Sequence, residues 1–212
     1  RTIRVISMIL VALFSIGVIL TARIIYCIYY DPVRCRSSPS TAVCTMAVLG
    51  SGGHTSELIS VLRVLRQERY SPLHFAIAES DHISRSRVNL KDFPTCNFHI
   101  IPRSRSVGQS FPSSLLSALK STISSIKLVY LLNPELIICN GPGTCVPICL
   151  SAFILRVCLA RKNKIIFIES FCRVNTLSLS GRIIYPIASS FYVQWPELHL
   201  QYPSAKYIGT LC

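Results

Sequence analysis

Residues 43–54 read VCTMAVLGSGGH, and this stretch decides the fold. Residues 43–49 form an almost continuous apolar run, which is typical of a strand buried on both faces. A glycine-rich turn follows at once, and residues 57–66 then show a helical pattern. The turn consists of Gly50, Ser51, Gly52, Gly53 and His54. A strand that enters a helix through such a turn predicts the first unit of an α/β domain.

The same alternation continues toward the carboxyl terminus. Short apolar runs, each typical of a buried parallel strand, occupy residues 74–78, 98–101, 136–139, 165–168, 191–193 and 207–208. Longer helical patterns occupy residues 115–132 and 146–159. We therefore expect a Rossmann-like, doubly wound parallel sheet of the α/β class.

The amino-terminal segment predicts a membrane anchor. No residue between Arg4 and Arg23 is charged, and this run is about long enough to cross a hydrocarbon core. A cleaved signal peptide is the alternative, but its apolar core is usually shorter, and Leu20 stands where a small residue is needed. We assign residues 1–30 to a transmembrane helix, residues 31–40 to a linker rich in Pro and Ser, and residues 41–212 to the globular domain.

Hydrophobic content, net charge and cysteine usage limit the kinds of protein that this chain can be. Half of the 212 residues are hydrophobic, the mean hydropathy is +0.48, and 22 basic against 9 acidic residues give a net charge of +13. Disorder is excluded, and the charge predicts an anionic partner such as a phospholipid surface, a phosphorylated substrate or nucleic acid. The ten cysteines show no zinc-binding spacing, and no asparagine lies in a glycosylation sequon. Both observations favour a reducing, cytosolic location for the domain.

Loops after the predicted strands are the candidate site, because ligands of such folds bind beyond the carboxyl ends of the strands. A second glycine-rich turn follows the strand at 136–139, and we expect the two turns to share an anion-binding cleft. Neither turn completes a dinucleotide or P-loop fingerprint. His54 is a candidate base, whereas Glu57 is interpreted as a partner of the helix dipole. The second turn consists of Asn140, Gly141, Pro142, Gly143 and Thr144.

Seven motifs follow one another as in the family of asparagine-linked glycosylation protein fourteen, which the chain resembles from residue 41 onward. They are GSGGHTSE at 50–57, AESD at 78–81, RSRSVGQS at 103–110, NGPGTCVPIC at 140–149, ESFCR at 169–173, LSLSG at 177–181 and VQWP at 193–196.

The resemblance implies the amino-terminal, acceptor-binding half of a GT-B glycosyltransferase similar to the bacterial lipid II synthase. Its members form the membrane subunit of a two-subunit UDP-N-acetylglucosamine (UDP-GlcNAc) transferase, inactive alone. A soluble donor-binding subunit completes the enzyme. Together they add the second GlcNAc to GlcNAc-pyrophosphoryl-dolichol on the cytosolic face of the endoplasmic reticulum. No cofactor, metal or nucleic acid is implied, and about 170 globular residues agree with one domain.

Site residues follow from the resemblance. His54 and Glu169 are the candidates for the catalytic base, and Gly50, Ser51, Gly52, Gly53, Asn140, Gly141, Gly143 and Thr144 are the candidates for acceptor or phosphate binding. Aromatic and apolar residues near the carboxyl terminus are expected to dock the donor-binding subunit, namely Trp195, Tyr202, Tyr207, Gly209 and Leu211. Two alternatives stay open. One is a pure anchor or scaffold without catalytic groups, and the other is an NAD-dependent reductase with Glu79 or Asp81 on a ribose.

Overall fold

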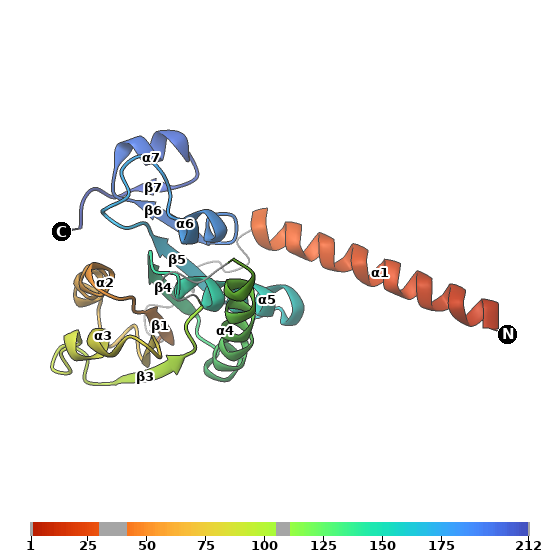
Figure 1. The fold of residues 1–212 in the computed structure, drawn as a ribbon, viewed down its shortest axis with the longest axis horizontal. Helices are drawn as coiled ribbons and strands as arrows, with labels where there is room; N and C mark the ends of the chain where they lie inside the picture. The colour runs from red at the N-terminus through yellow and green to blue at the C-terminus, as the bar shows by residue number, and fades with distance from the viewer. Residues whose placement is uncertain (1, 30–41, 105–110, 212) are drawn as a thin grey trace.

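A computed structural model describes residues 2–29, 42–104 and 111–211 (Figure 1). Within these residues, seven strands form one sheet in the order β3-β2-β1-β4-β5-β6-β7, and all neighbouring strands are parallel. The strands are β1 (Thr45–Val48), β2 (Leu73–Ala78), β3 (Cys96–Ile101), β4 (Leu136–Asn140), β5 (Lys164–Ile168), β6 (Ser190–Val193) and β7 (Lys206–Tyr207). The strand order reverses between β1 and β4, where a doubly wound sheet opens a crevice at its carboxyl edge.

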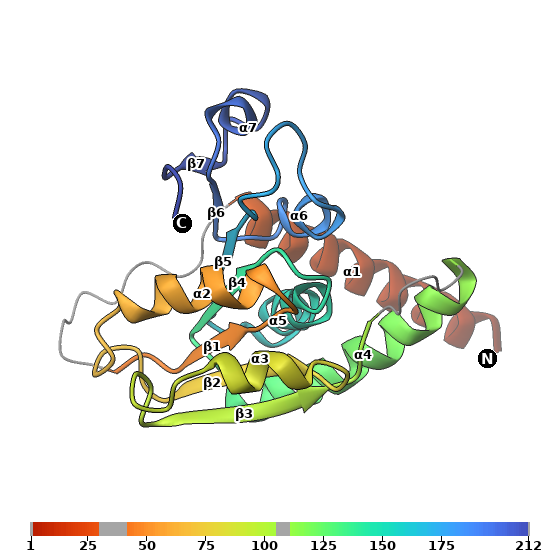
Figure 2. The ribbon, with the colours of Figure 1, turned by 60° about the vertical axis from the view of Figure 1, so that its left-hand side comes forward.

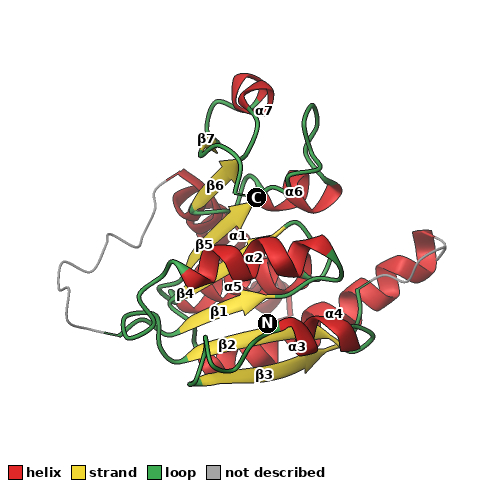
Figure 3. Cartoon of the chain, turned by 90° about the vertical axis from the view of Figure 1, so that its left-hand side faces the viewer, coloured by secondary structure: helices red, strands yellow, loops and turns green. Residues whose placement is uncertain are grey.

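Helices cover both faces of the sheet. Figures 2 and 3 show α2 and α3 on one face, with α4 and α5 on the other. The helices of the described ranges are α1 (Thr2–Tyr29), α2 (Gly53–Arg63), α3 (His82–Arg87), α4 (Phe111–Leu132), α5 (Cys145–Leu159), α6 (Leu179–Ile184) and α7 (Pro196–Gln201). This layering confirms the predicted α/β class and the doubly wound parallel sheet.

Two cores result, because successive residues of a strand face opposite sides. From β1, Met46 and Val48 join the core beneath α5, while Ala47 packs with Leu58 and Leu62 of α2. Each core contains residues of several strands, so close packing on both faces holds the strand ends at the carboxyl edge of the sheet in fixed positions.

Helix α1 is long and apolar enough to cross a membrane, as the sequence predicted. It extends away from the domain (Figure 1), and most of its side chains are exposed. Its last turns contact α5, where Arg23 Nη2 donates a hydrogen bond to the carbonyl of Arg156 at 3.1 Å and Cys27 is buried. The carboxyl-terminal end of α1 is therefore packed against the domain. The predicted linker at 31–40 lies outside the described residues.

Boundaries differ from the predictions in two ways. Helix α2 begins at Gly53 and not at residue 57, because Gly52 adopts a φ of 73° that ends the turn and starts the helix. The short helices α3, α6 and α7 were not predicted, since six residues are too few to show an apolar period.

Candidate functional site

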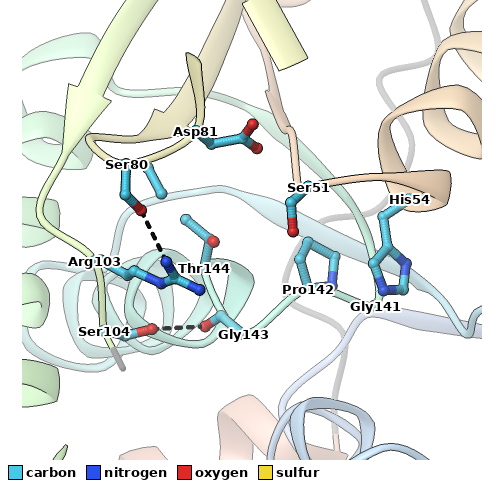
Figure 4. Close-up of a pocket in the computed structure, with 11 residues that line it drawn as sticks. Ser51, His54, Ser80, Asp81, Arg103, Ser104, Gly141, Pro142, Gly143 and Thr144 are labelled. Carbon is cyan, nitrogen blue, oxygen red and sulfur yellow. Dashed lines mark hydrogen bonds between the residues drawn. The ribbon is translucent and has the colours of Figure 1, made fainter. Parts of the chain in front are cut away.

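A pocket of about 280 Å³ opens at the carboxyl edge of the sheet, where the loops after β1, β2, β3 and β4 meet (Figure 4). Ser51 and His54 come from the first glycine-rich turn, and the second turn contributes four further residues. The complete lining is Ser51, His54, Ala78, Ser80, Asp81, Arg103, Ser104, Gly141, Pro142, Gly143 and Thr144. The two turns thus share one cleft, at the position where ligands bind in doubly wound sheets.

The two glycine-rich turns also pack directly on each other. A Cβ built on Gly50 would overlap the ring of Pro142, so only glycine fits between β1 and the second turn. The Gly50 carbonyl accepts hydrogen bonds from the hydroxyls of Thr55 and of Ser84, the latter at 3.0 Å. Gly50 therefore shapes the site without lining it.

His54 stands at the wall between the turns. Its Nδ1 lies 3.1 Å from Asn140 Oδ1, and a Cβ on Gly141 would lie 2.7 Å from its Cε1. Gly141 has a φ of 67°, so a side chain there would be strained as well as crowded. Together these contacts fix the imidazole against the second turn.

Asn140 connects His54 to Glu57, a carboxylate buried below the pocket. Its Nδ2 donates to Glu57 Oε2 at 2.9 Å, and Glu57 is 7% exposed. Interpreting Glu57 as a partner of the helix dipole was wrong, because Glu57 lies beyond the first turn of α2 and its carboxylate accepts from side chains below the pocket.

Charge in the pocket comes from two side chains after β2 and β3. Arg103 Nη1 donates to Ser80 Oγ at 3.2 Å, and of the described lining residues Arg103 alone carries a permanent positive charge. Asp81 is occupied locally, since its carboxylate caps α3 by accepting from the amide and hydroxyl of Ser84 at 3.1 and 2.6 Å. Arg103 is thus the side chain best placed to meet an anion.

Glu169 occupies a different place from the one the sequence suggested. Its side chain is fully buried, it does not line the pocket, and its oxygens accept from the amide of Ser170 and from the amide and hydroxyl of Ser178. Burial raises the pKa of this carboxyl, although the hydrogen bonds from Ser178 and Ser170 oppose the shift. A Cβ on Gly181 would overlap Glu169 Oε2, so α6 is packed directly on this carboxylate. The structure brings His54 to the pocket without Glu169.

The carboxyl-terminal residues fall into two groups. Tyr202 packs against the core and contacts the ring of Tyr185 edge-on at 5.4 Å, so it completes the domain. Tyr207 is 50% exposed, and Trp195 Nε1 donates to the Phe171 carbonyl at 2.7 Å.

Leu211 borders an apolar hollow of about 220 Å³ on the α2 face of the sheet. Gly209 has a φ of 74° in the segment that leads to Leu211. The lining of this hollow is Val61, Leu65, Tyr70, Leu136, Ile138, Ile166, Ile168, Tyr192, Ile208 and Leu211.

The sequence predicted that the two turns meet at one cleft, and the structure brings them together there, but Arg103 and the inward-facing Glu57 were not singled out as site residues. Arg103 was detectable, because it follows a predicted strand at the edge where the turns converge. Glu57 was not detectable, because only the fold shows that its side chain points inward.

Comparisons with known proteins agree with this geometry. Residues 45–211 match the family described as oligosaccharide biosynthesis protein Alg14 like. The chain is 40% identical over 185 residues to the human UDP-N-acetylglucosamine transferase subunit ALG14, covering 82% of this chain and 85% of that protein. It is 41% identical over 172 residues to the subunit of the same name from Yarrowia lipolytica, covering 78% and 80% of the two chains.

The fold has a solved counterpart. The crystal structure of Acinetobacter baumannii MurG matches with a TM-score of 0.60 and 18% identity. The match covers 80% of this chain but only 45% of MurG, so this chain corresponds in fold to less than half of that protein. The family match and the ALG14 relatives, which are matched over most of their length, establish that the chain belongs to the Alg14 family of oligosaccharide biosynthesis proteins.

Proposed function

We propose that this chain is the membrane subunit of a two-subunit UDP-GlcNAc transferase that adds the second GlcNAc to GlcNAc-pyrophosphoryl-dolichol. It recruits the soluble donor-binding subunit to the endoplasmic reticulum membrane and helps to bind the lipid acceptor. The observation that carries the proposal is the pocket, where His54, Arg103 and two glycine-rich turns converge in a fold that matches 45% of MurG. In this proposal the donor-binding subunit supplies the other wall of the GT-B cleft.

The pocket suits a pyrophosphate-linked sugar. Arg103 supplies positive charge, and the second turn leads into α5 at Thr144, so the positive end of that helix dipole favours an anion. The net charge of +13 favours approach to an anionic acceptor and to lipid headgroups.

His54 is the group that takes the proton. The acceptor hydroxyl attacks the anomeric carbon of UDP-GlcNAc, the bond from that carbon to the phosphate oxygen breaks, and UDP leaves with the electron pair. The hydroxyl proton passes to the imidazole of His54, which lines the pocket. We assign this step to His54 and not to Glu169, because the Glu169 carboxylate is fully buried and held by the Ser178 turn.

Membrane attachment follows from α1, which we propose crosses the bilayer once and leaves the domain on the cytosolic face. All eight cysteines within the described residues are free, which fits a reducing compartment. A protease added outside sealed microsomes should digest the domain. Protection of the domain would contradict this topology.

The donor-binding subunit docks at the carboxyl-terminal segment. Leu211 and the apolar hollow beside it, together with the exposed ring of Tyr207, provide apolar and aromatic surface of the kind that anchors interfaces. Tyr202 contributes less, because it is half-buried and its ring packs against the core of the domain.

A reconstitution assay tests the proposed function. Transfer of GlcNAc from UDP-GlcNAc to GlcNAc-pyrophosphoryl-dolichol is measured with this chain alone, with the soluble subunit alone, and with both. We expect product only with both chains. Equal turnover by the soluble subunit alone would refute a contribution of this chain to the reaction.

A further inference from the structure

Glu57 is a buried carboxylate directly behind the pocket. Within the described residues no lysine or arginine forms an ion pair with it. Four neutral donors surround it instead: Asn140 Nδ2 at 2.9 Å, Ser170 Oγ at 3.3 Å, and the Phe171 amide and Gln194 Nε2 at 3.4 Å. These donors come from the ends of β4 and β6 and from the loop after β5, so Glu57 joins α2 to the far half of the sheet.

The carboxylate sets the direction of the hydrogen bonds that reach His54. An ionised carboxylate only accepts, so the Asn140 side chain must present its NH₂ group to Glu57. Its Oδ1 is then turned to His54 Nδ1, 3.1 Å away, and an amide oxygen also only accepts. The proton of a neutral imidazole must therefore reside on Nδ1, which leaves Nε2 with a free lone pair.

We infer that Glu57 is a positioning residue that acts through Asn140 to hold His54 in the Nδ1–H tautomer, with Nε2 ready to accept the proton of the acceptor hydroxyl. This inference rests on the proposed function and adds to it a residue that does not touch substrate. Of the two possible tautomers of a neutral His54, only this one lets Nε2 act as the base.

Burial makes this arrangement effective. Asn140 is fully buried and Glu57 nearly so, and water therefore does not compete for their hydrogen bonds. Gly141 lies against the Cε1–Nδ1 edge of the His54 ring, next to Asn140, and leaves no room for the imidazole to move toward the second turn. A carboxylate that only filled a structural role would not need to control which way the Asn140 amide points.

Isosteric exchange of the two groups tests the inference in the complex with the donor-binding subunit. Glu57→Gln removes the group that orients the Asn140 amide, and Asn140→Asp places two carboxylates face to face. We expect each single variant to lower kcat about 10- to 100-fold while the KM for the lipid acceptor stays close to that of the wild type. Glu68→Gln makes the same chemical change outside the pocket and its hydrogen-bonded partners, and it should leave kcat unchanged.

The double variant Glu57→Gln/Asn140→Asp exchanges the donor and the acceptor of the 57–140 hydrogen bond, and it leaves an acceptor at position 140 for His54. The new amide at position 57 then donates to the new carboxylate at position 140, and this carboxylate accepts from His54 Nδ1–H. The kcat of the double variant should therefore recover well above that of either single variant. In parallel, ¹⁵N-histidine NMR of the complex reports the tautomer, with the His54 signal assigned by its loss in His54→Ala. We expect the Nδ1–H form in the wild type and double variant, and loss of that preference in Glu57→Gln.

Two results would overturn the inference. One is a Glu57→Gln variant with wild-type kcat or an unchanged His54 tautomer. The other is a double variant that melts like the wild type but is no more active than the poorer single variant. These failures are separate from failure of the proposed function, which would appear as an inactive wild-type complex or a fully active His54→Ala complex.

Discussion

Two buried glutamates lie beneath the same loops, and their surroundings differ. Glu57 is joined through Asn140 to His54 and the pocket. Glu169 is joined to the Ser178 turn and lies under α6. The two carboxylates are similarly buried, so the groups that each one contacts, and not burial itself, decide which of them can influence the pocket.

The hydrogen bonds around Glu57 also reach the carboxyl-terminal segment. Gln194 donates to both Glu57 and the Glu169 carbonyl, and its Oε1 accepts from the Leu211 amide at 3.0 Å. The proposed docking surface and the proposed base are therefore ends of one hydrogen-bonded chain. The Glu169 carboxylate meets this chain only through Ser170, whose amide donates to Glu169 and whose hydroxyl donates to Glu57.

The largest effect is expected from deleting residues 209–212, which removes the Leu211 end of this chain. Leu211 borders the apolar hollow and bonds Gln194, so its loss should abolish co-purification of the donor-binding subunit. Membrane attachment and protease resistance of this chain should stay normal, since both cores remain. Retained pairing would show that docking lies elsewhere on the domain.

Gly141→Ala tests whether the activity depends on the close packing of the His54 imidazole against the second glycine-rich turn. The new Cβ would lie 2.7 Å from the ring and would face a φ of 67°, so the imidazole must move. We expect turnover of the assembled complex to fall about 100-fold, as expected for a misplaced catalytic group. Gly17→Ala in α1 is the control, because a Cβ there meets nothing within 4 Å and Gly17 lies outside the pocket. Equal activity of the two variants would contradict the account.

Arg103→Gln tests whether Arg103 contributes to acceptor binding and not to the chemical step. Loss of the positive charge should raise the KM for the pyrophosphate-linked acceptor about tenfold and change kcat much less. Arg103→Lys keeps the charge and should recover part of the affinity. A KM unchanged in both variants would remove Arg103 from acceptor binding.

Glu169→Gln should give the smallest effect, and on stability alone. Because the pKa of Glu169 in the folded chain is raised above 4.5, its contribution to stability is present at lower pH and lost as the pH rises through the raised value. The melting temperature of the wild type should therefore fall relative to that of Glu169→Gln across this window, and the matching change in the free energy of unfolding should be on the order of 1 kcal/mol or less. Turnover at neutral pH should stay close to wild type, and a loss comparable to that of His54→Ala would return Glu169 to the list of candidate bases.

Much of this architecture was predictable from the sequence. Apolar runs such as residues 136–139 predicted buried parallel strands, and the glycine-rich turns predicted the shared pocket, because their signals are local. The roles of the two glutamates were not predictable. Glu57 lies within α2 and Glu169 directly follows β5. The direction of each side chain depends on contacts with residues more than 80 positions away for Glu57 and on the Ser178 turn for Glu169. Tyr202, which was expected at the docking surface, is half-buried, with its ring packed against the core.

The turnover of His54→Ala in the complex with the donor-binding subunit shows whether this chain supplies the general base of the transfer reaction. Assembly is verified by co-purification, and transfer to GlcNAc-pyrophosphoryl-dolichol is measured under saturating substrates. We expect an intact complex whose kcat is lower by about 10²- to 10⁴-fold, the contribution of a general base. An intact complex with wild-type kcat would contradict this expectation and would make this chain an anchor without a catalytic group.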